Sequence, residues 1–198
     1  MALSSSTLAS LIQTNLMADG ANGSNLQSFC TAVATGIVMS IIGKSFVTAD
    51  VGLVGGIGAG TGTGIQGLVS LSMKSEGLSL MSSQGVNADG LMKAIMDATV
   101  SHLSSSASLS SIDTPVFSGV GTIVVGSIAV VPSEMSQNID TQLQDVGAIG
   151  DNRTNLATAI GTAVANGILS SGTGTLVITG TPLSGPNPGA GSGTGTIS

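Results

Sequence analysis

Apolar residues recur every three or four positions in the first part of the chain, the spacing of one face of an α-helix. A first run of this kind extends over Ser6–Ala18, and the glycine-containing turn Gly20–Gly23 follows it. A second, more apolar stripe begins at Leu26 and continues to Ile41. The two runs predict a pair of helices joined by a short turn, in which glycine takes the left-handed backbone that a Cβ disfavours.

Parts of this pattern return farther along the chain. The segment Thr31-Ala-Val-Ala-Thr-Gly-Ile-Val38 recurs as Thr162-Ala-Val-Ala-Asn-Gly-Ile-Leu169, with six of eight residues identical. The tract Gly58-Ala-Gly-Thr-Gly-Thr-Gly-Ile65 recurs as Gly189-Ala-Gly-Ser-Gly-Thr-Gly-Thr196, also with six identities and also 131 residues later. Two separate matches at one spacing indicate an internal repeat, which decides the architecture before any motif is considered.

Half of that spacing has its own matches. Leu26, Leu91 and Leu156 lie 65 residues apart, and each opens an apolar helical stretch. We therefore expect three units, covering residues 1–66, 67–131 and 132–198. A unit of this size buries too little apolar surface to fold stably alone, so the units are expected to share a core or to bury surface against other chains.

Each unit ends in β-rich sequence. The runs Gly121–Gly126 and Gly174–Gly180 are β-branched and bounded by glycine, which predicts short strands, and Ser45–Thr48 is a weaker counterpart. Gly/Thr tracts follow at Gly52–Gly67 and Gly185–Thr196. Because glycine has nothing to bury, they are expected to be linkers, or extended arms that order against another subunit.

The fold class predicted is therefore α+β, with three internal repeats, each a helix hairpin followed by a short β-strand and a Gly/Thr-rich arm. The middle unit departs from this pattern, because a serine-rich loop over Ser104–Ser111 precedes its strand and no glycine tract follows it.

Composition narrows the functional classes. Charged residues make up 7% of the chain, and four cations face ten acids for a net charge of −6, so there is no basic face to neutralise the phosphates of a nucleic acid. Three phenylalanines are the only aromatic residues, which weighs against a compact small-molecule cleft. The longest apolar run, Ala32–Gly43, is short for a membrane span, and the start Met1-Ala-Leu-Ser lacks the positive charge of a secretory signal.

Two glycine motifs resemble phosphate-binding sequences. Gly43-Lys44-Ser45 matches the end of a phosphate-binding loop, but the required first glycine is missing and the motif closes a helix instead of opening one. Gly62-Thr-Gly64-Ile-Gln-Gly67 fits the dinucleotide fingerprint in form, yet it stands in a glycine tract with no alternating strand–helix pattern around it. We expect neither to bind a nucleotide.

Side chains for catalysis are few. His102 is the only histidine and is expected to pack or to cap a helix, while Cys30 lies inside an apolar helix, where burial disfavours the thiolate. The acids are scattered, with no paired spacing that indicates a metal site. The sequence therefore predicts no catalytic, cofactor-binding or metal-binding residues, no cofactor, and a protein that is not an enzyme.

The Thr-Ala-Val-Ala-Thr-Gly-Ile-Val helix, the Gly-Ala-Gly-Thr-Gly-Thr-Gly tract, the strand Gly-Thr-Leu-Val-Ile-Thr-Gly-Thr-Pro and the scarcity of aromatics resemble virion structural proteins of contractile-tailed bacteriophages of aquatic bacteria. The resemblance implies a non-enzymatic subunit of the capsid, neck or tail, made in the host cytoplasm, located in the virion, and partnered by copies of itself and other virion proteins. From the charge balance and the short apolar run above, we expect neither nucleic acid nor a membrane as a partner. Two other classes stay open: a secreted or surface-displayed adhesin-like repeat module, and a small-molecule binding module that uses the Gly-rich loops.

Overall fold

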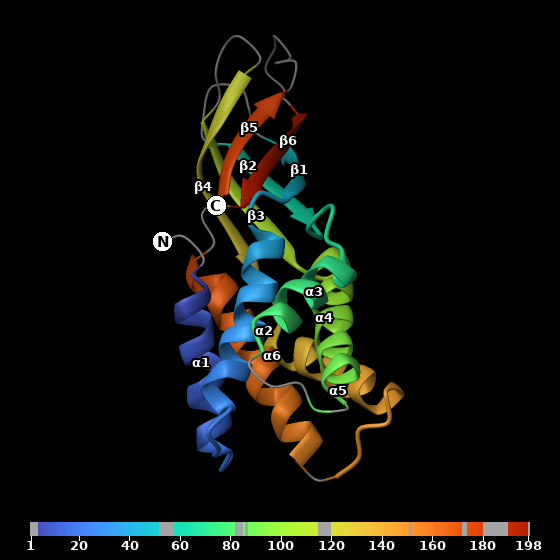
Figure 1. Ribbon diagram of the computed structural model, residues 1–198. Coiled ribbons are helices and arrows are strands. Elements are labelled where there is room, and N and C mark those ends of the chain that lie inside the picture. Colours follow the sequence, from blue (N-terminus) through green and yellow to red (C-terminus); the bar gives the residue numbers. More distant parts are fainter. Residues whose placement is uncertain are drawn as a thin grey trace.

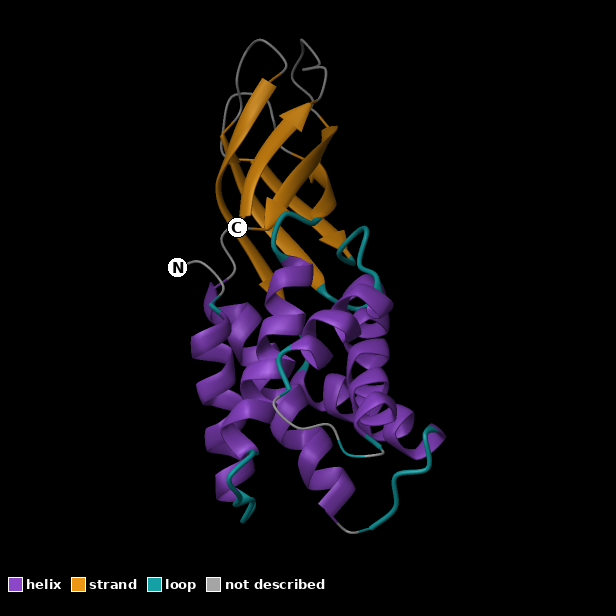
Figure 2. Ribbon diagram, viewed as in Figure 1, coloured by secondary structure: helices purple, strands orange, loops and turns teal. Residues whose placement is uncertain are grey.

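The protein combines a helical bundle with a β-barrel stacked on one end of it, as the computed structural model shows (Figures 1 and 2). The α+β class is thus confirmed. The structure describes residues 4–51, 58–81, 85, 87–114, 120–150, 152–171, 174–179 and 190–197.

Along the described chain, two helices and two strands follow one another in the same order three times. The first set is α1 (Ser5–Ala18), α2 (Leu26–Ile41), β1 (Ser45–Val51) and β2 (Gly58–Thr63). The second is α3 (Ser70–Ser79), α4 (Ala88–Ser105), β3 (Ser108–Thr114) and β4 (Val120–Ala129). The third is α5 (Pro132–Asp145), α6 (Asn152–Ser171), β5 (Gly174–Thr179) and β6 (Ala190–Ile197).

Both layers close on themselves. Each helix packs against the next one along the chain, and α6 packs against α1. The strands form a closed antiparallel barrel in chain order, and β6 completes it by pairing with β1 from Ser45 opposite Thr196 to Val51 opposite Ala190. The first and last segments of the chain therefore hold each other in both the bundle and the barrel.

The helices form where the apolar spacing predicts them. The first helix begins within one residue of the prediction, and its buried residues include Leu8, Ile12 and Leu16, all on one face. α2 is buried on most of its circumference, and Ile37 is fully buried. The predicted glycine turn is confirmed as well, because Gly20 has a φ of 86° and closes α1.

The predicted single strand and Gly/Thr-rich arm of the first and third units are wrong where the structure describes them. The first tract contributes strand β2, which pairs with β1 and β3, and the third contributes β6, which pairs with β5 and β1. Residues 52–57 of the first tract and 185–189 of the tract in the third unit lie outside the described residues.

The strand register explains why glycine-rich strands are compatible with a barrel. Phe46 is buried and lies opposite Gly195, so the alternate residues Gly193 and Gly191 share the interior face with it. Eight strands enclose an interior just wide enough for side chains, so a barrel of six is narrower still. Glycine in β2 and β6 leaves room inside the barrel for larger side chains from the other strands. The glycine-rich tracts therefore need not supply a core of their own.

The serine-rich loop predicted at residues 104–111 is also wrong. α4 continues through Ser105, and β3 begins at Ser108 after the fully buried Ala107. Serine is tolerated in the last turn of a helix and on the outer face of a strand, so polarity alone gave a misleading signal here.

Small residues let the helices approach closely. A Cβ placed on Gly36 of α2 would lie 2.7 Å from the carbonyl oxygen of Met73 and 3.1 Å from the amide nitrogen of Gly77, both on α3. A Cβ on Gly161 of α6 would lie 2.7 Å from Cα of Ser136 on α5. At these points one backbone contacts another, so the glycines set the spacing of the bundle.

We predict that Gly36→Ala destabilises the protein by about 1–3 kcal/mol, because rigid α3 backbone has to move to admit the methyl group. Gly90→Ala is the matched control: a Cβ on this helical glycine would make only an ordinary van der Waals contact, 3.9 Å from Cβ of Val146. It should stabilise by about 0.4–1 kcal/mol, since alanine lowers the entropy of the unfolded chain. Urea unfolding measures both changes, and a neutral Gly36→Ala would refute the close-packing interpretation.

A second prediction concerns the glycine-rich strands. Amide hydrogen exchange of the free, full-length chain should show protection in Gly58–Thr63 and Ala190–Ile197, because both strands pair on two sides in the barrel. The turn residues Asn22–Ser24 should exchange fast and serve as an internal reference. Strand exchange as fast as that reference would restore the interpretation of these tracts as arms.

Candidate functional site

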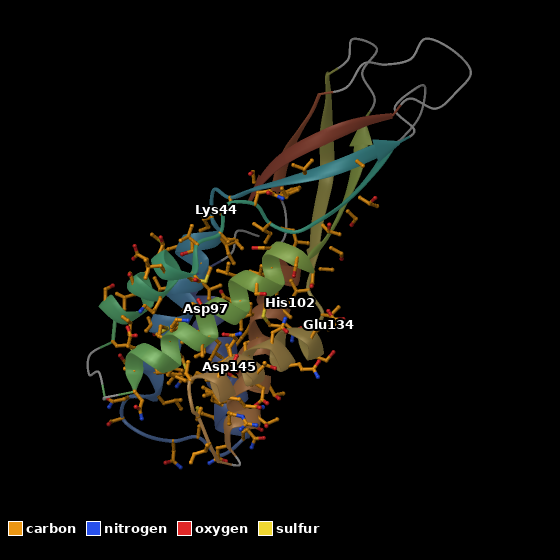
Figure 3. All side chains as sticks on the ribbon, turned by 90° about the vertical axis from the view of Figure 1, so that its right-hand side faces the viewer. Lys44, Asp97, His102, Glu134 and Asp145 are labelled. Atoms are coloured by element: carbon orange, nitrogen blue, oxygen red, sulfur yellow. The ribbon has the colours of Figure 1, made fainter. Side chains whose placement is uncertain are left out.

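His102 is the most unusual polar side chain among the described residues. It lies near the end of α4 (Figure 3) and is 1% exposed. Its contact on α5 is with Asn138. The Asn138 amide nitrogen lies 3.1 Å from His102 Nδ1, so the histidine accepts there and carries its proton on Nε2. Nε2 is buried and has no partner among the described residues.

Burial lowers the pKa of His102 from its ordinary value, because the charged imidazolium loses its hydration. Glu134, one turn before Asn138 on α5, acts in the opposite direction through its negative charge, and Figure 3 shows it near the histidine. The geometry keeps a neutral histidine inside a helix–helix contact, which agrees with the packing role predicted from the sequence. No pattern in the sequence indicated Asn138 as its hydrogen-bond partner.

Cys30 lies fully buried in α2. Burial raises the pKa of its thiol to about 11, so the thiolate that a nucleophile needs is scarce at neutral pH. Among the described residues, no group of three His, Cys, Asp or Glu side chains is placed to hold a metal ion.

The structure separates both glycine motifs from phosphate-binding geometry. Gly43 has a φ of 78° and ends α2, and β1 starts two residues later, whereas a phosphate-binding loop runs from a strand into a helix. In the second motif, the Gly64 amide donates to the Ala107 carbonyl and the Ile65 amide to the Leu103 carbonyl. These amides bind the end of α4 and are not available to a phosphate.

Gly64 has a further structural reason to be glycine. Its φ is 77°, and a Cβ at this position would lie 2.1 Å from the Ser104 carbonyl oxygen. The glycine tract thus includes the contact by which the chain leaving the barrel is anchored to the bundle. The buried Ile65 beside it completes that anchor.

An open groove of about 610 Å³ runs between α5 and α6. Serine, threonine and glutamine line much of it, together with Asp140. Arg153 holds Asp140 with contacts of 2.8 and 3.3 Å, and this guanidinium lowers the pKa of the carboxyl. An ionised, paired carboxylate is a poor proton donor, and among the described residues that line the groove Asp140 is the only acid or base.

The exposed apolar side chains are gathered at two levels of the described structure. One group surrounds the junction of the bundle and the barrel, which we call the waist: Met39, Ile42, Val47, Val69, Leu71 and Val131. The other lies at or just after the ends of α1, α3 and α5 that point away from the barrel: Met17, Leu80, Val146 and Ile149. Ile149 is the extreme case, at 92% exposed.

Comparisons of the chain with known protein families, with curated proteins and with solved structures give no match. Within the part of the chain that the structure describes, no helix is both long and apolar enough to cross a lipid bilayer.

We predict that His102 makes stability depend on pH below about 6.5, the ordinary histidine pKa. Because its folded pKa is depressed, the unfolded chain takes up this proton first as the pH falls, so the contribution is complete above 6.5 and is lost below it. His102→Gln, which keeps a polar side chain for Asn138, should flatten this part of the stability curve. Unfolding measured from pH 5 to 8 tests it, and parallel curves for the two proteins would contradict it.

Proposed function

We propose that this chain is a non-enzymatic accessory structural subunit of a bacteriophage virion, as a capsid decoration or as a component of the neck or tail. The observation that carries the proposal is the gathering of exposed apolar side chains at two levels of a small, charge-poor protein. Such groups mark surfaces that contact other proteins when they are contiguous. The resemblance of the Gly/Thr-rich segments to virion proteins supplies the kind of assembly.

The waist is the stronger of the two candidate contact surfaces. Met39 and Ile42 stand at the end of α2, and Val69 and Leu71 stand at the start of α3, which packs against that end. Leu71 is 66% and Met39 is 61% exposed, although each could be polar without disturbing the core. Burial of these side chains against a neighbouring subunit would stabilise an assembly by about 25 cal/mol for each Å² removed from water.

We further infer that the chain is a threefold repeat of a helix hairpin and a β-hairpin, with units 1–66, 67–131 and 132–198. The first helices of the units support this. Each has a buried side chain at its fourth residue, namely Leu8 in α1, Met73 in α3 and Met135 in α5. Two of the hairpins also share a turn: the amides of Ala21 and Ala148 donate to the carbonyls five residues before them, Leu16 and Leu143, at 2.9 Å.

The second helices give independent support. Gly36, His102 and Gly167 are 66 and 65 residues apart, and each faces the first helix of the next unit in the ring. Gly36 lies against Met73 of α3 and His102 against Asn138 of α5, while a Cβ on Gly167 would lie 3.1 Å from a methyl carbon of Leu8 on α1. The repeat accounts for this recurrence at one face.

A threefold repeat in one chain suits an axial or pseudo-threefold position in a particle. One copy then presents three similar faces, and symmetry-related neighbours can each contact one of them. The middle unit is the least regular of the three, since α3 is shorter than α1 and α5. It also exposes Leu71 at the waist.

We predict that the purified chain associates in solution and that the double variant Val69→Ser, Leu71→Ser is monomeric with an unchanged circular dichroism spectrum. Size-exclusion chromatography with light scattering measures this, and Ser75→Ala on exposed α3 surface is the matched control. Peptide mass spectrometry of purified phage particles tests the virion itself. A wild-type monomer at all concentrations, together with its absence from particles, would contradict the proposal.

A further inference from the structure

The chain contains two Asn-Gly sequences among its described residues, and the structure places them in opposite environments. Asn22-Gly23 lies exposed in the turn between α1 and α2. Asn166-Gly167 lies inside α6, where Asn166 is exposed but Gly167 is buried. Since the two dipeptides are identical, any difference in their chemistry comes from the fold.

We propose that Asn22 is a site of spontaneous covalent modification, at which the native fold permits deamidation while it protects Asn166. In the first step the backbone nitrogen of Gly23 attacks Cγ of Asn22. A bond forms between these atoms, the bond from Cγ to Nδ2 breaks, and ammonia leaves with the proton of the Gly23 amide. Water then opens the cyclic imide at either carbonyl, which gives aspartate or isoaspartate at residue 22.

The attacking nitrogen is accessible at this turn. Among the described residues, no hydrogen bond uses the Gly23 amide, whereas the neighbouring amides of Gly20 and Ala21 donate to the carbonyls of Met17 and Leu16. Apart from its two neighbours in the chain, no described residue has an atom within 4 Å of where a Gly23 Cβ would stand, so no packed element crowds this side of the turn. The Asn22 side chain makes one long contact, 3.3 Å from Nδ2 to the Gly20 carbonyl.

The same nitrogen is occupied at the second dipeptide. Inside a helix the amide of residue 167 donates to the carbonyl four residues earlier and is held away from the side chain of residue 166. A Cβ on Gly167 would also lie 3.1 Å from Leu8 of α1, so this stretch of α6 is held against a neighbouring helix. Attack there requires local opening of α6.

The modification leaves the core in place. Gly20 and Ala21 close α1 through their own hydrogen bonds before the chain reaches Asn22, and α2 begins at Leu26. The new carboxylate follows the exposed Asp19 by three positions in the chain, so it adds negative charge to the end of the bundle that points away from the barrel. Isoaspartate in addition lengthens the backbone of the turn by one methylene.

The test is peptide mapping of the full-length chain after incubation at mildly alkaline pH, with aspartate and isoaspartate quantified at residues 22 and 166. In the native protein, residue 22 should react more than about tenfold faster, because reaction at residue 166 waits for local unfolding of a packed helix. In concentrated urea the two rates should converge. Equal native rates, or an unreactive Asn22, would overturn the proposal.

Two variants make the assignment specific. Asn22→Gln should abolish the acidic species that ion exchange separates during incubation, because the longer side chain places its carbonyl carbon badly for attack. Asn166→Gln is the matched control and should leave the acidic species unchanged in the native protein. The reverse result, in which only Asn166→Gln removes it, would place the reaction in α6 and refute the role of the turn.

Discussion

Closure of the chain on itself is the constraint on which the rest of this structure depends. α6 packs on α1 and β6 pairs with β1, so neither layer has an open end. A sheet of six short strands would otherwise present two edges, each a row of unpaired amides and carbonyls. With closure, three helix hairpins that are individually too small share one core, and the buried set runs continuously through all six described helices.

Glycine makes this closure possible in two different ways. In the bundle, Gly36 and Gly161 remove a side chain at the point where two helices touch backbone to backbone. In the barrel, Gly191, Gly193 and Gly195 occupy the interior face beside the buried Phe46. The chain has few large side chains, and it compensates by bringing its backbones close together.

The helices could be predicted from the sequence because their apolar stripes are long and regular; Ile12, Ile37 and Ile139 are buried as that spacing requires. The glycine-rich strands could not, because β2 and β6 are held by pairing partners far away in the chain, such as Ser45 opposite Thr196. These tracts have few apolar side chains to bury, which suggested that they would not be ordered within a single chain. For the site, His102 was recognisable as a packing residue, whereas its neighbours on α5 depend on a helix contact that local spacing does not reveal.

The seam between the first and last strands also determines how the molecule responds to damage. β6 lies between β5 and β1, so loss of this one strand bares two sheet edges at once. Proteolysis or a premature stop just before Ala190 therefore leaves the six described helices in the chain and converts the closed barrel into an open sheet with unpaired edges. The open edges of β1 and β5 can then pair only with the open edges of another truncated molecule, so truncated chains would associate through intermolecular β-pairing.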